Sequence, residues 1–204
     1  MGEVKPTRSE LINLDKKIKL AKSGHSLLKR KRDGLIREFF IVFDEAKKRK
    51  SVLSDKYALA VRELELARAV DGTIAVRSAG EALKQKPEVT LTTRNIMGVV
   101  VPGITFEKTQ KKFTERGYGI IGTSPRIDSA SGAYEAVLDD VVMAAEIETT
   151  MRRLLLEIER TKRRVNALEF AIIPTLQRDA AFIRLRLEEL ERENVFRLKR
   201  IKDK

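Results

Sequence analysis

The sequence predicts a mainly α-helical protein whose two terminal segments pair as a long antiparallel coiled coil. Apolar residues recur at heptad spacing through both terminal segments, which is the pattern that two paired helices require. Charged residues make up 35% of the chain and aromatic residues only 5%, which favours long helices over a thick core. Between the two segments, Gly, Pro and β-branched residues predict a small region of a different kind.

The first long helix is expected to begin just after Thr7 and to run to about residue 70. Thr7 is a suitable N-cap, and Glu10 three residues later completes a capping box. Asp71-Gly72 is a stop signal. After Leu53, a four-residue step to Tyr57 predicts a stutter, which locally unwinds a coiled coil.

The second long helix is expected to begin at Pro125 and to run to about Lys202. Thr123 and Ser124 supply the N-cap, and proline is well suited to the first helical position. Pro174 lies inside this helix and lacks the N–H that would bond the preceding turn. We therefore expect a kink at Pro174.

The two helices need a register as well as a direction. Laying Leu11 beside Leu198 gives pairs whose residue numbers add up to about 208, and small residues then meet large ones across the seam. His25 and Arg32 occupy seam positions where an apolar residue is usual. Polar residues at such positions can fix the register, and we assign this role to both.

The predicted division of the chain is a coiled-coil shaft, residues 1–70 and 125–204, and a small globular end, residues 71–124. Within the globular end, residues 74–85 are expected to form a short helix that Lys86-Pro87 terminates.

A β-hairpin is expected after this short helix. Val89 to Thr93 alternate with β-branched residues, and further strand-forming residues occupy 99–106. Two places could hold the turn, namely residues 95–98 or Pro102-Gly103, and the pattern leaves both open.

The residues for catalysis or metal binding are missing from the sequence. There is no cysteine, and His25 is the only histidine. Residues 117–122 match GxGxxG formally, but they lack the preceding βαβ unit that gives this motif its meaning, so a loop is expected. We predict no catalytic residue, no cofactor and no metal. The least polar stretch, residues 96–106, is too short to span a bilayer.

Positive charge is concentrated at the two chain ends. Residues 1–50 hold 15 Lys and Arg against 7 Asp and Glu, and residues 152–204 hold 15 against 9. If the ends meet in space, they form a basic tip that would attract nucleic acid, anionic lipid or an acidic protein cavity. The candidate tip residues are Arg8, Arg197, Lys199, Arg200 and Lys202.

Several blocks of sequence resemble a known family. They are PTRSEL (6–11), GHSLLKRKRD (24–33), RRVNALE (163–169), IIP (172–174) and FRLKRIK (196–202). Their order and spacing are similar to the D subunit of the archaeal A-type and related V-type ATP synthases. NIMGVVVP (95–102) is similar to the hairpin segment of that family.

The resemblance implies the central-stalk rotor of a rotary ATP synthase, with no catalytic role of its own. The terminal helices would enter the cavity of the catalytic A and B subunits. The middle region would lie near the F subunit of the stalk, and the shaft would stand on the funnel-shaped C subunit on the membrane ring. The resemblance implies a cytoplasmic protein, peripheral on the membrane, with no nucleic-acid partner and no membrane span. Charge and heptads alone allow an alternative, a basic coiled coil that binds nucleic acid or tethers other molecules.

Overall fold

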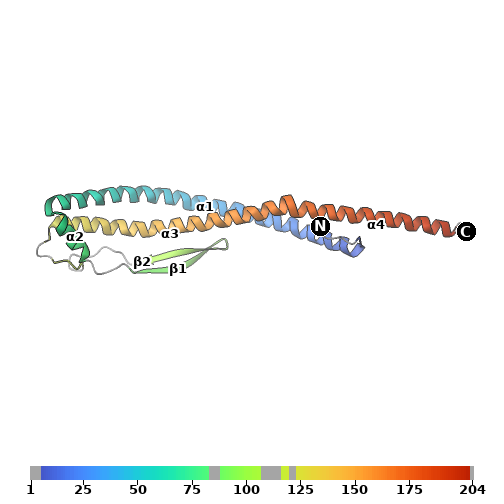
Figure 1. Ribbon diagram of the computed structural model, residues 1–204, viewed down its shortest axis with the longest axis horizontal. Helices are drawn as coiled ribbons and strands as arrows, with labels where there is room; N and C mark the ends of the chain where they lie inside the picture. Colours follow the sequence, from blue (N-terminus) through green and yellow to red (C-terminus); the bar gives the residue numbers. More distant parts are fainter. Residues whose placement is uncertain (1–5, 83–87, 107–115, 120–122, 203–204) are drawn as a thin grey trace. The chain divides into compact units, whose positions relative to one another are not determined.

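The computed structural model describes residues 6–82, 88–106, 116–119 and 123–202 (Figure 1). Its elements, in chain order, are α1 (Arg8–Asp71), α2 (Thr73–Glu81), β1 (Val89–Ile96), β2 (Val99–Phe106), α3 (Pro125–Ala167), the π-helical segment η2 (Leu168–Ile172) and α4 (Ile173–Lys202). The prediction of a mainly helical chain with a central hairpin is confirmed. The chain forms two compact units, residues 1–36 with 157–204 and residues 37–156.

The limits of α1 follow from its end residues. Thr7 Oγ1 accepts a hydrogen bond from the backbone N–H of Glu10 at 3.2 Å, which confirms Thr7 as the N-cap. The helix ends at Asp71, and Gly72 follows with φ of 84°, a left-handed conformation that glycine adopts without steric cost.

The stutter predicted in α1 stays a prediction. Tyr57, which it places in the seam, is 54% exposed. Ala60 and Ala67 are fully buried, as the phase after the stutter predicts, but both also lie at heptad spacing from Leu53. The two alanines therefore do not distinguish a stutter from an uninterrupted heptad phase.

The start and end of the second long helix are as predicted, but the helix is interrupted. It begins at Pro125, where Ser124 Oγ accepts a hydrogen bond from the backbone N–H of Arg126 at 3.3 Å, and it ends at Lys202. Between α3 and α4, η2 forms one wide turn, in which the N–H of Ile173 donates to the carbonyl of Leu168. Pro174 follows at once. Its ring would crowd the preceding turn of a regular α-helix, and a wide turn relieves that crowding.

The seam shifts by one residue across η2. Two heptads after the buried Val165 comes Asp179, but the buried residue is Ala180. Three heptads after the buried Thr161 comes Phe182, which is 48% exposed, whereas Ile183 is fully buried. A π-turn holds one residue more than an α-turn, so η2 absorbs the extra residue and keeps the apolar face directed at the partner helix.

In the second unit, α2 packs against the end of α1 and the start of α3. Ala79 of α2 shares a buried cluster with Ala67, Ile127 and Ala130. The predicted short helix is confirmed, but α2 ends at Glu81, earlier than expected. The expected stop at Lys86-Pro87 lies outside the described residues.

The hairpin turns at Met97-Gly98, which confirms the first of the two predicted positions. Both residues have positive φ, 50° and 86°, as a two-residue turn matched to the twist of the strands requires. Asn95 Oδ1 accepts a hydrogen bond from the N–H of Gly98 at 2.8 Å. The alternative, Pro102-Gly103, lies within β2, where it pairs with Thr93 and Thr92 of β1.

One face of β2 attaches the hairpin to the helices. Val99 and Val101 are buried, whereas the residues of β1 are mostly exposed. Arg153 of α3 donates to the main-chain carbonyl of Val100 at 2.7 Å, and the hairpin runs beside α3 (Figure 1). An ion pair of 2.5 Å between Lys56 and Asp140 joins α1 to α3 nearby.

Candidate interaction surfaces

The pairing of α1 with α4 decides which terminal residues lie together. Arg8 pairs with Glu191 at 2.5 Å, and Asp15 pairs with Arg184 at 3.1 Å. Both pairs have residue numbers that add up to 199, so the predicted register of about 208 is wrong by more than two helical turns. The apolar contacts agree with the ion pairs, since Leu11 and Leu187 pack around one buried cluster. That cluster consists of Leu14, Ala180 and Ile183.

Charge explains why the predicted register fails. It would place Arg8 beside Arg200 and Asp15 beside Glu193, two contacts between like charges, which are unfavourable at this spacing. The observed register replaces both with attractive pairs. Apolar heptads tolerate many registers, so the flanking charges select among them.

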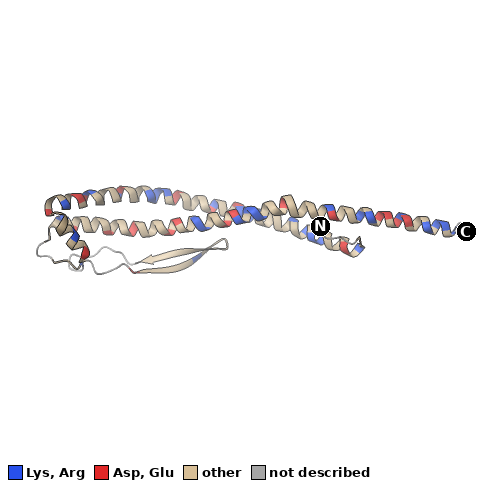
Figure 2. Ribbon diagram, in the orientation of Figure 1, with Lys and Arg blue, Asp and Glu red and all other residues tan. Residues whose placement is uncertain are grey.

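This register leaves the end of α4 without α1 beside it. We call Arg192–Lys202 the terminal overhang, because α1 begins at Arg8, opposite Glu191. Every residue of the terminal overhang is exposed. It holds five basic residues and one acidic residue, and Figure 2 shows this basic end of α4.

The predicted basic tip is therefore divided by the structure. Arg197, Lys199, Arg200 and Lys202 lie together on the terminal overhang, as expected. Arg8 does not join them, because it lies on α1 and is paired with Glu191. Among the residues predicted for the tip, all of which the structure describes, four therefore lie together on α4 and Arg8 lies apart from them on α1.

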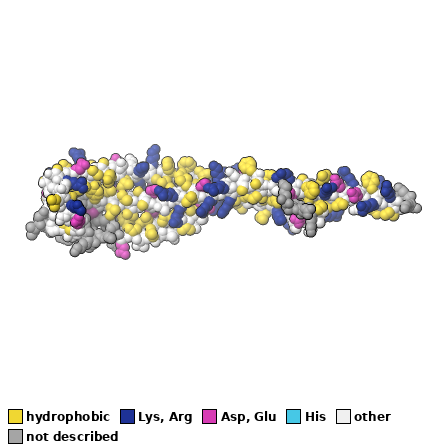
Figure 3. All heavy atoms as spheres, viewed as in Figure 1, with side chains coloured by type: hydrophobic (Ala, Val, Ile, Leu, Met, Phe, Trp, Pro, Cys, Tyr) yellow, Lys and Arg dark blue, Asp and Glu magenta, His cyan; other side chains and the backbone are white. Residues whose placement is uncertain are grey.

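Apolar side chains accompany these charges. Leu198 and Ile201 are 65% and 71% exposed, and they share the helix face of Leu187 at heptad-related spacing. The seam face of α4 therefore continues into the terminal overhang, and apolar and basic side chains alternate along this part of the surface (Figure 3). A surface of this kind can bind a partner that offers apolar contacts beside acidic or carbonyl oxygens.

The predicted register markers differ in what they contact. His25 Nε2 lies 3.4 Å from Glu169 Oε2 in η2, so His25 does face the opposing segment. The Arg32 guanidinium bonds to Asp33, its own neighbour in α1, at 2.8 and 3.0 Å. Beside it, Lys31 reaches across to Glu157 at 3.7 Å. A role for His25 and Arg32 in setting the register stays a prediction, as does a kink at Pro174.

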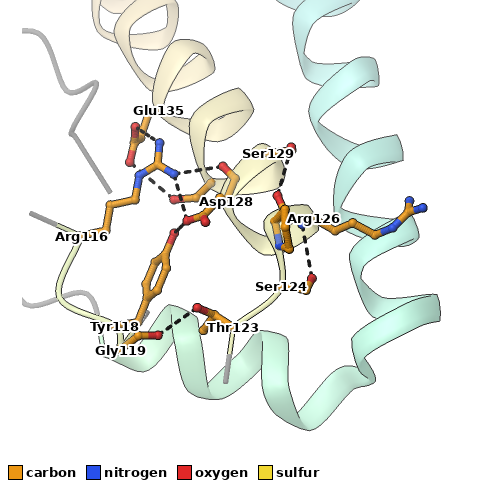
Figure 4. A network of polar contacts seen from close by, with 11 residues as sticks. Arg116, Tyr118, Gly119, Thr123, Ser124, Arg126, Asp128, Ser129 and Glu135 are labelled. Atoms are coloured by element: carbon orange, nitrogen blue, oxygen red, sulfur yellow. Dashed lines mark hydrogen bonds and ion pairs between the residues drawn. The ribbon is translucent and has the colours of Figure 1, made fainter. Parts of the chain in front are cut away.

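A network of polar contacts that the sequence did not reveal lies in the second unit (Figure 4). Arg116, only 7% exposed, donates to the main-chain oxygen of Asp128 at 3.0 Å and to its Oδ1 at 3.3 Å. The same guanidinium donates to Glu135 Oε2 at 3.1 Å. The Tyr118 hydroxyl donates to Asp128 Oδ1 at 2.6 Å. These contacts tie residues 116–119 to the first turns of α3.

Burial changes the acid–base properties of two members of this network. The pKa of Tyr118 is raised, first because burial disfavours the phenolate and then because its hydroxyl bonds to Asp128. For Arg116, burial lowers the pKa, but bonds to Tyr118 and Glu135 and the Glu135 charge outweigh it, so the pKa is raised. Both groups keep their usual protonation at neutral pH. The network therefore has the character of a structural contact that holds residues 116–119 against α3.

Gly132 is the sequence signal that could have pointed to this network. A Cβ added at Gly132 would lie 3.3 Å from Nη2 of Arg116, so the guanidinium passes close over the backbone of α3. A glycine inside a helix that costs stability without an evident reason indicates a close approach of this kind.

The described residues offer contact surfaces and not a catalytic or metal site. Within residues 6–82, 88–106, 116–119 and 123–202, no group of three His, Cys, Asp or Glu side chains could hold a metal ion. None of the described helices combines the length and the apolar character that crossing a membrane would need.

Comparisons with known proteins agree over almost the whole chain. The family model for the D subunit of ATP synthase matches residues 10–203. The D subunit of the A-type ATP synthase of Methanosarcina mazei is 56% identical over 200 residues, which cover 98% of this chain and 96% of the relative. The protein of the same name from Archaeoglobus fulgidus is 55% identical over 205 residues, covering 100% of this chain and 98% of the relative. That of Halorubrum lacusprofundi is 51% identical over 200 residues, covering 98% and 88%.

Proposed function

The chain belongs to the family of ATP synthase D subunits, and we propose that it is the central rotor shaft of a rotary A/V-type ATP synthase. In this role it transmits torque between the ion-driven membrane ring and the catalytic head, and it performs no catalysis itself. The terminal overhang is the observation that supports this proposal most directly. This helix end is basic, and its apolar side chains are exposed to solvent. Insertion into a protein cavity would bury these apolar side chains.

Torque transmission needs two helices that do not slide past each other. Opposite charges at Arg8–Glu191 and Asp15–Arg184 resist sliding, because a shift by one or two turns would separate them. The seam adds to this resistance through the buried cluster of Leu14, Ala180 and Ile183. A shaft that keeps its register passes rotation from one end to the other.

The shaft acts on its partners by presenting different side chains in each orientation. Leu198 and Ile201 lie exposed on one face of α4, so rotation changes which protein of the head this face contacts. Contacts that differ between conformations shift the populations of those conformations. We place the terminal overhang inside the head formed by the A and B subunits, and the second unit near the F subunit. The funnel-shaped C subunit is the proposed link to the membrane ring.

Charge reversal on the terminal overhang tests the proposed head contact. The variant carries Arg197→Glu, Lys199→Glu, Arg200→Glu and Lys202→Glu. Four reversed charges at a protein interface should weaken assembly with the catalytic head by at least about tenfold and reduce coupled ATPase activity. Binding to the head in a salt series and coupled ATPase activity are the two measurements.

A matched control carries the same number of reversals elsewhere, at the exposed residues Lys47, Lys48, Lys50 and Arg62 of α1. Helix content measured by circular dichroism should stay the same in the control. In the terminal-overhang variant it should fall by no more than the last turns of α4, where acidic residues oppose the helix dipole. Normal assembly and coupling in the terminal-overhang variant would contradict the proposal.

A further inference from the structure

Gly24 occupies the interior of α1 although nothing in the surrounding structure requires a glycine there. A Cβ added at Gly24 would meet no atom within 4 Å, and its φ is not in the left-handed range. A helix interior is less stable with glycine than with alanine, because glycine loses more backbone freedom on folding. Gly24 therefore weakens α1 locally without serving a close contact.

The second helix is weakened at the same level of the pair. His25 Nε2 lies 3.4 Å from Glu169 Oε2, which places the Gly24-His25 step opposite η2. In η2 the hydrogen bonding is that of a wide turn, and Pro174, the second residue of α4, provides no N–H for the carbonyl of Phe170. A glycine within the continuous helix α1 and a π-turn in the other helix thus lie opposite each other.

Packing is thin at this level as well. On α1, none of residues 15–34, all described by the structure, is buried; residues 36–59 share this property, so it marks this level only together with the facing helix. On the other helix, Val165 and Ala180 are buried, and none of the described residues between them is. Phe170 in η2 is 75% exposed. Segments with little buried apolar surface are the ones that open first.

We propose that the level of Gly24 and η2 is a flexible joint, at which both helices yield together before the flanking segments do. One weak helix beside a firm one would be held straight by its partner, whereas two weak segments at one level allow a bend or twist. The joint would let the segment that ends in the terminal overhang change direction relative to residues 27–36 and 157–165 of the same unit. This inference does not depend on the proposed function.

Hydrogen exchange of the full-length chain tests the joint. Amides of residues 21–28 and 169–176 should exchange at least about tenfold faster than interior amides of 11–18 and 180–187, which hold the buried cluster of Leu14, Ala180 and Ile183. Gly24→Ala should slow exchange at Gly24 and also in the facing residues 169–176, by about fivefold. That factor corresponds to the roughly 1 kcal/mol by which alanine exceeds glycine in a helix interior.

Gly80→Ala is the matched control. Gly80 lies in the last turn of α2, and a Cβ there would also meet nothing within 4 Å, so the substitution adds a methyl group to a helix elsewhere without a clash. It should leave exchange at 21–28 and 169–176 unchanged. Equal protection along the helix pair in the unsubstituted chain would overturn the proposal. A Gly24→Ala effect confined to α1 would overturn it too, because the two helices would then yield separately.

Distances between spin labels test bending directly, and the absence of cysteine makes labelling straightforward. One pair replaces Lys16 and Arg30, which flank Gly24, and a control pair replaces Lys48 and Arg62 at the same spacing on α1; all four are exposed. The distance distribution of the first pair should be broader than that of the control, and Gly24→Ala should narrow it. Equally narrow distributions would overturn the proposal.

Discussion

Arg116 holds two carboxylates at once in a place that water hardly reaches. Its side chain is 7% exposed, and those of Asp128 and Glu135 are 23% and 12% exposed. By contrast, the side chains of the Arg8–Glu191 pair are 78% and 60% exposed. Solvent weakens this ion pair, so it contributes at most about 1 kcal/mol to the free energy of unfolding. Removing Arg116 would leave two partly buried charges without their main partner, a change that typically costs about 3 kcal/mol or more.

Tyr118 reports on this network through its titration. Its raised pKa means that the folded chain favours the neutral phenol. The stabilisation is therefore complete below about pH 10, the ordinary pKa of tyrosine, and is lost as pH rises through the folded pKa. Absorbance of tyrosinate during an alkaline titration measures this. One of the three tyrosines should ionise above the ordinary range.

The control for this titration is Tyr118→Phe, which should remove the late step. In this variant the free energy of unfolding should also fall less steeply above pH 10, because no phenol at this position ionises on unfolding. A variant whose missing step lies at or below pH 10 would contradict the account of the network given above.

The contacts of Arg116 were not predictable from the sequence, because only the folded chain brings Asp128 and Glu135 close to it. Asp128 and Glu135 lie on one face of α3, and Arg116 precedes that helix in a non-helical segment. Periodicity fixes the face of a helix but not the path of a loop across it. Gly132 was noticeable as a glycine inside a helix, but its reason, a guanidinium 3.3 Å from the position of a Cβ, needs coordinates.

At the scale of elements, local rules located the ends of helices and strands. Thr7 and Ser124 cap α1 and α3 as expected, because capping depends on residues only a few positions apart. The hairpin turn was narrowed to two places and lies where Gly98 can adopt positive φ. The kink predicted at Pro174 stays a prediction, and the π-turn that precedes this proline was not foreseen, because its place depends on the seam with the facing helix.

Gly103 permits close packing between the strands of the hairpin. A Cβ at this position would lie 2.7 Å from Oγ1 of Thr92, which donates a hydrogen bond to the Gly103 carbonyl. Gly103→Ala should therefore destabilise the hairpin by about 1–2 kcal/mol, since either the strand or the Thr92 side chain must move. Hydrogen exchange of the β1 and β2 amides is the measurement.

Thr92→Ala provides the corresponding rescue. Removing the hydroxyl clears the space that the new Cβ needs, so Gly103→Ala should cost clearly less in a Thr92→Ala background. The double-mutant cycle isolates this contact from the general effect of alanine in a strand. A cost that is the same in both backgrounds would show that the clash with Thr92 is not the cause.

For the whole chain, the antiparallel partnership of the two terminal segments was foreseeable, but their register was not. Heptads determine which face of each helix is apolar, and any shift that preserves this face gives acceptable packing. The register was selected by long-range ion pairs such as Asp15–Arg184. Each pair contributes little to the free energy of unfolding, but together they disfavour registers that place like charges opposite each other. A basic tip formed by both chain ends was predicted, whereas the structure shows the terminal overhang of α4 without α1 beside it.

Removal of the terminal overhang separates folding from partner binding. A chain that ends at Glu191 keeps Arg8–Glu191 and the cluster of Leu14, Ala180 and Ile183, so its unfolding free energy should change by less than about 0.5 kcal/mol. Ile183→Ala, which opens a cavity in that cluster, should instead cost about 2–4 kcal/mol. Denaturant unfolding of the isolated chain compares the two variants, and assembly with the catalytic head should be impaired in the shortened one. If shortening destabilised the isolated chain as much as Ile183→Ala does, residues 192–202 would have to pack against the chain itself. The exposed face of Leu198 and Ile201 would then serve folding and not a partner.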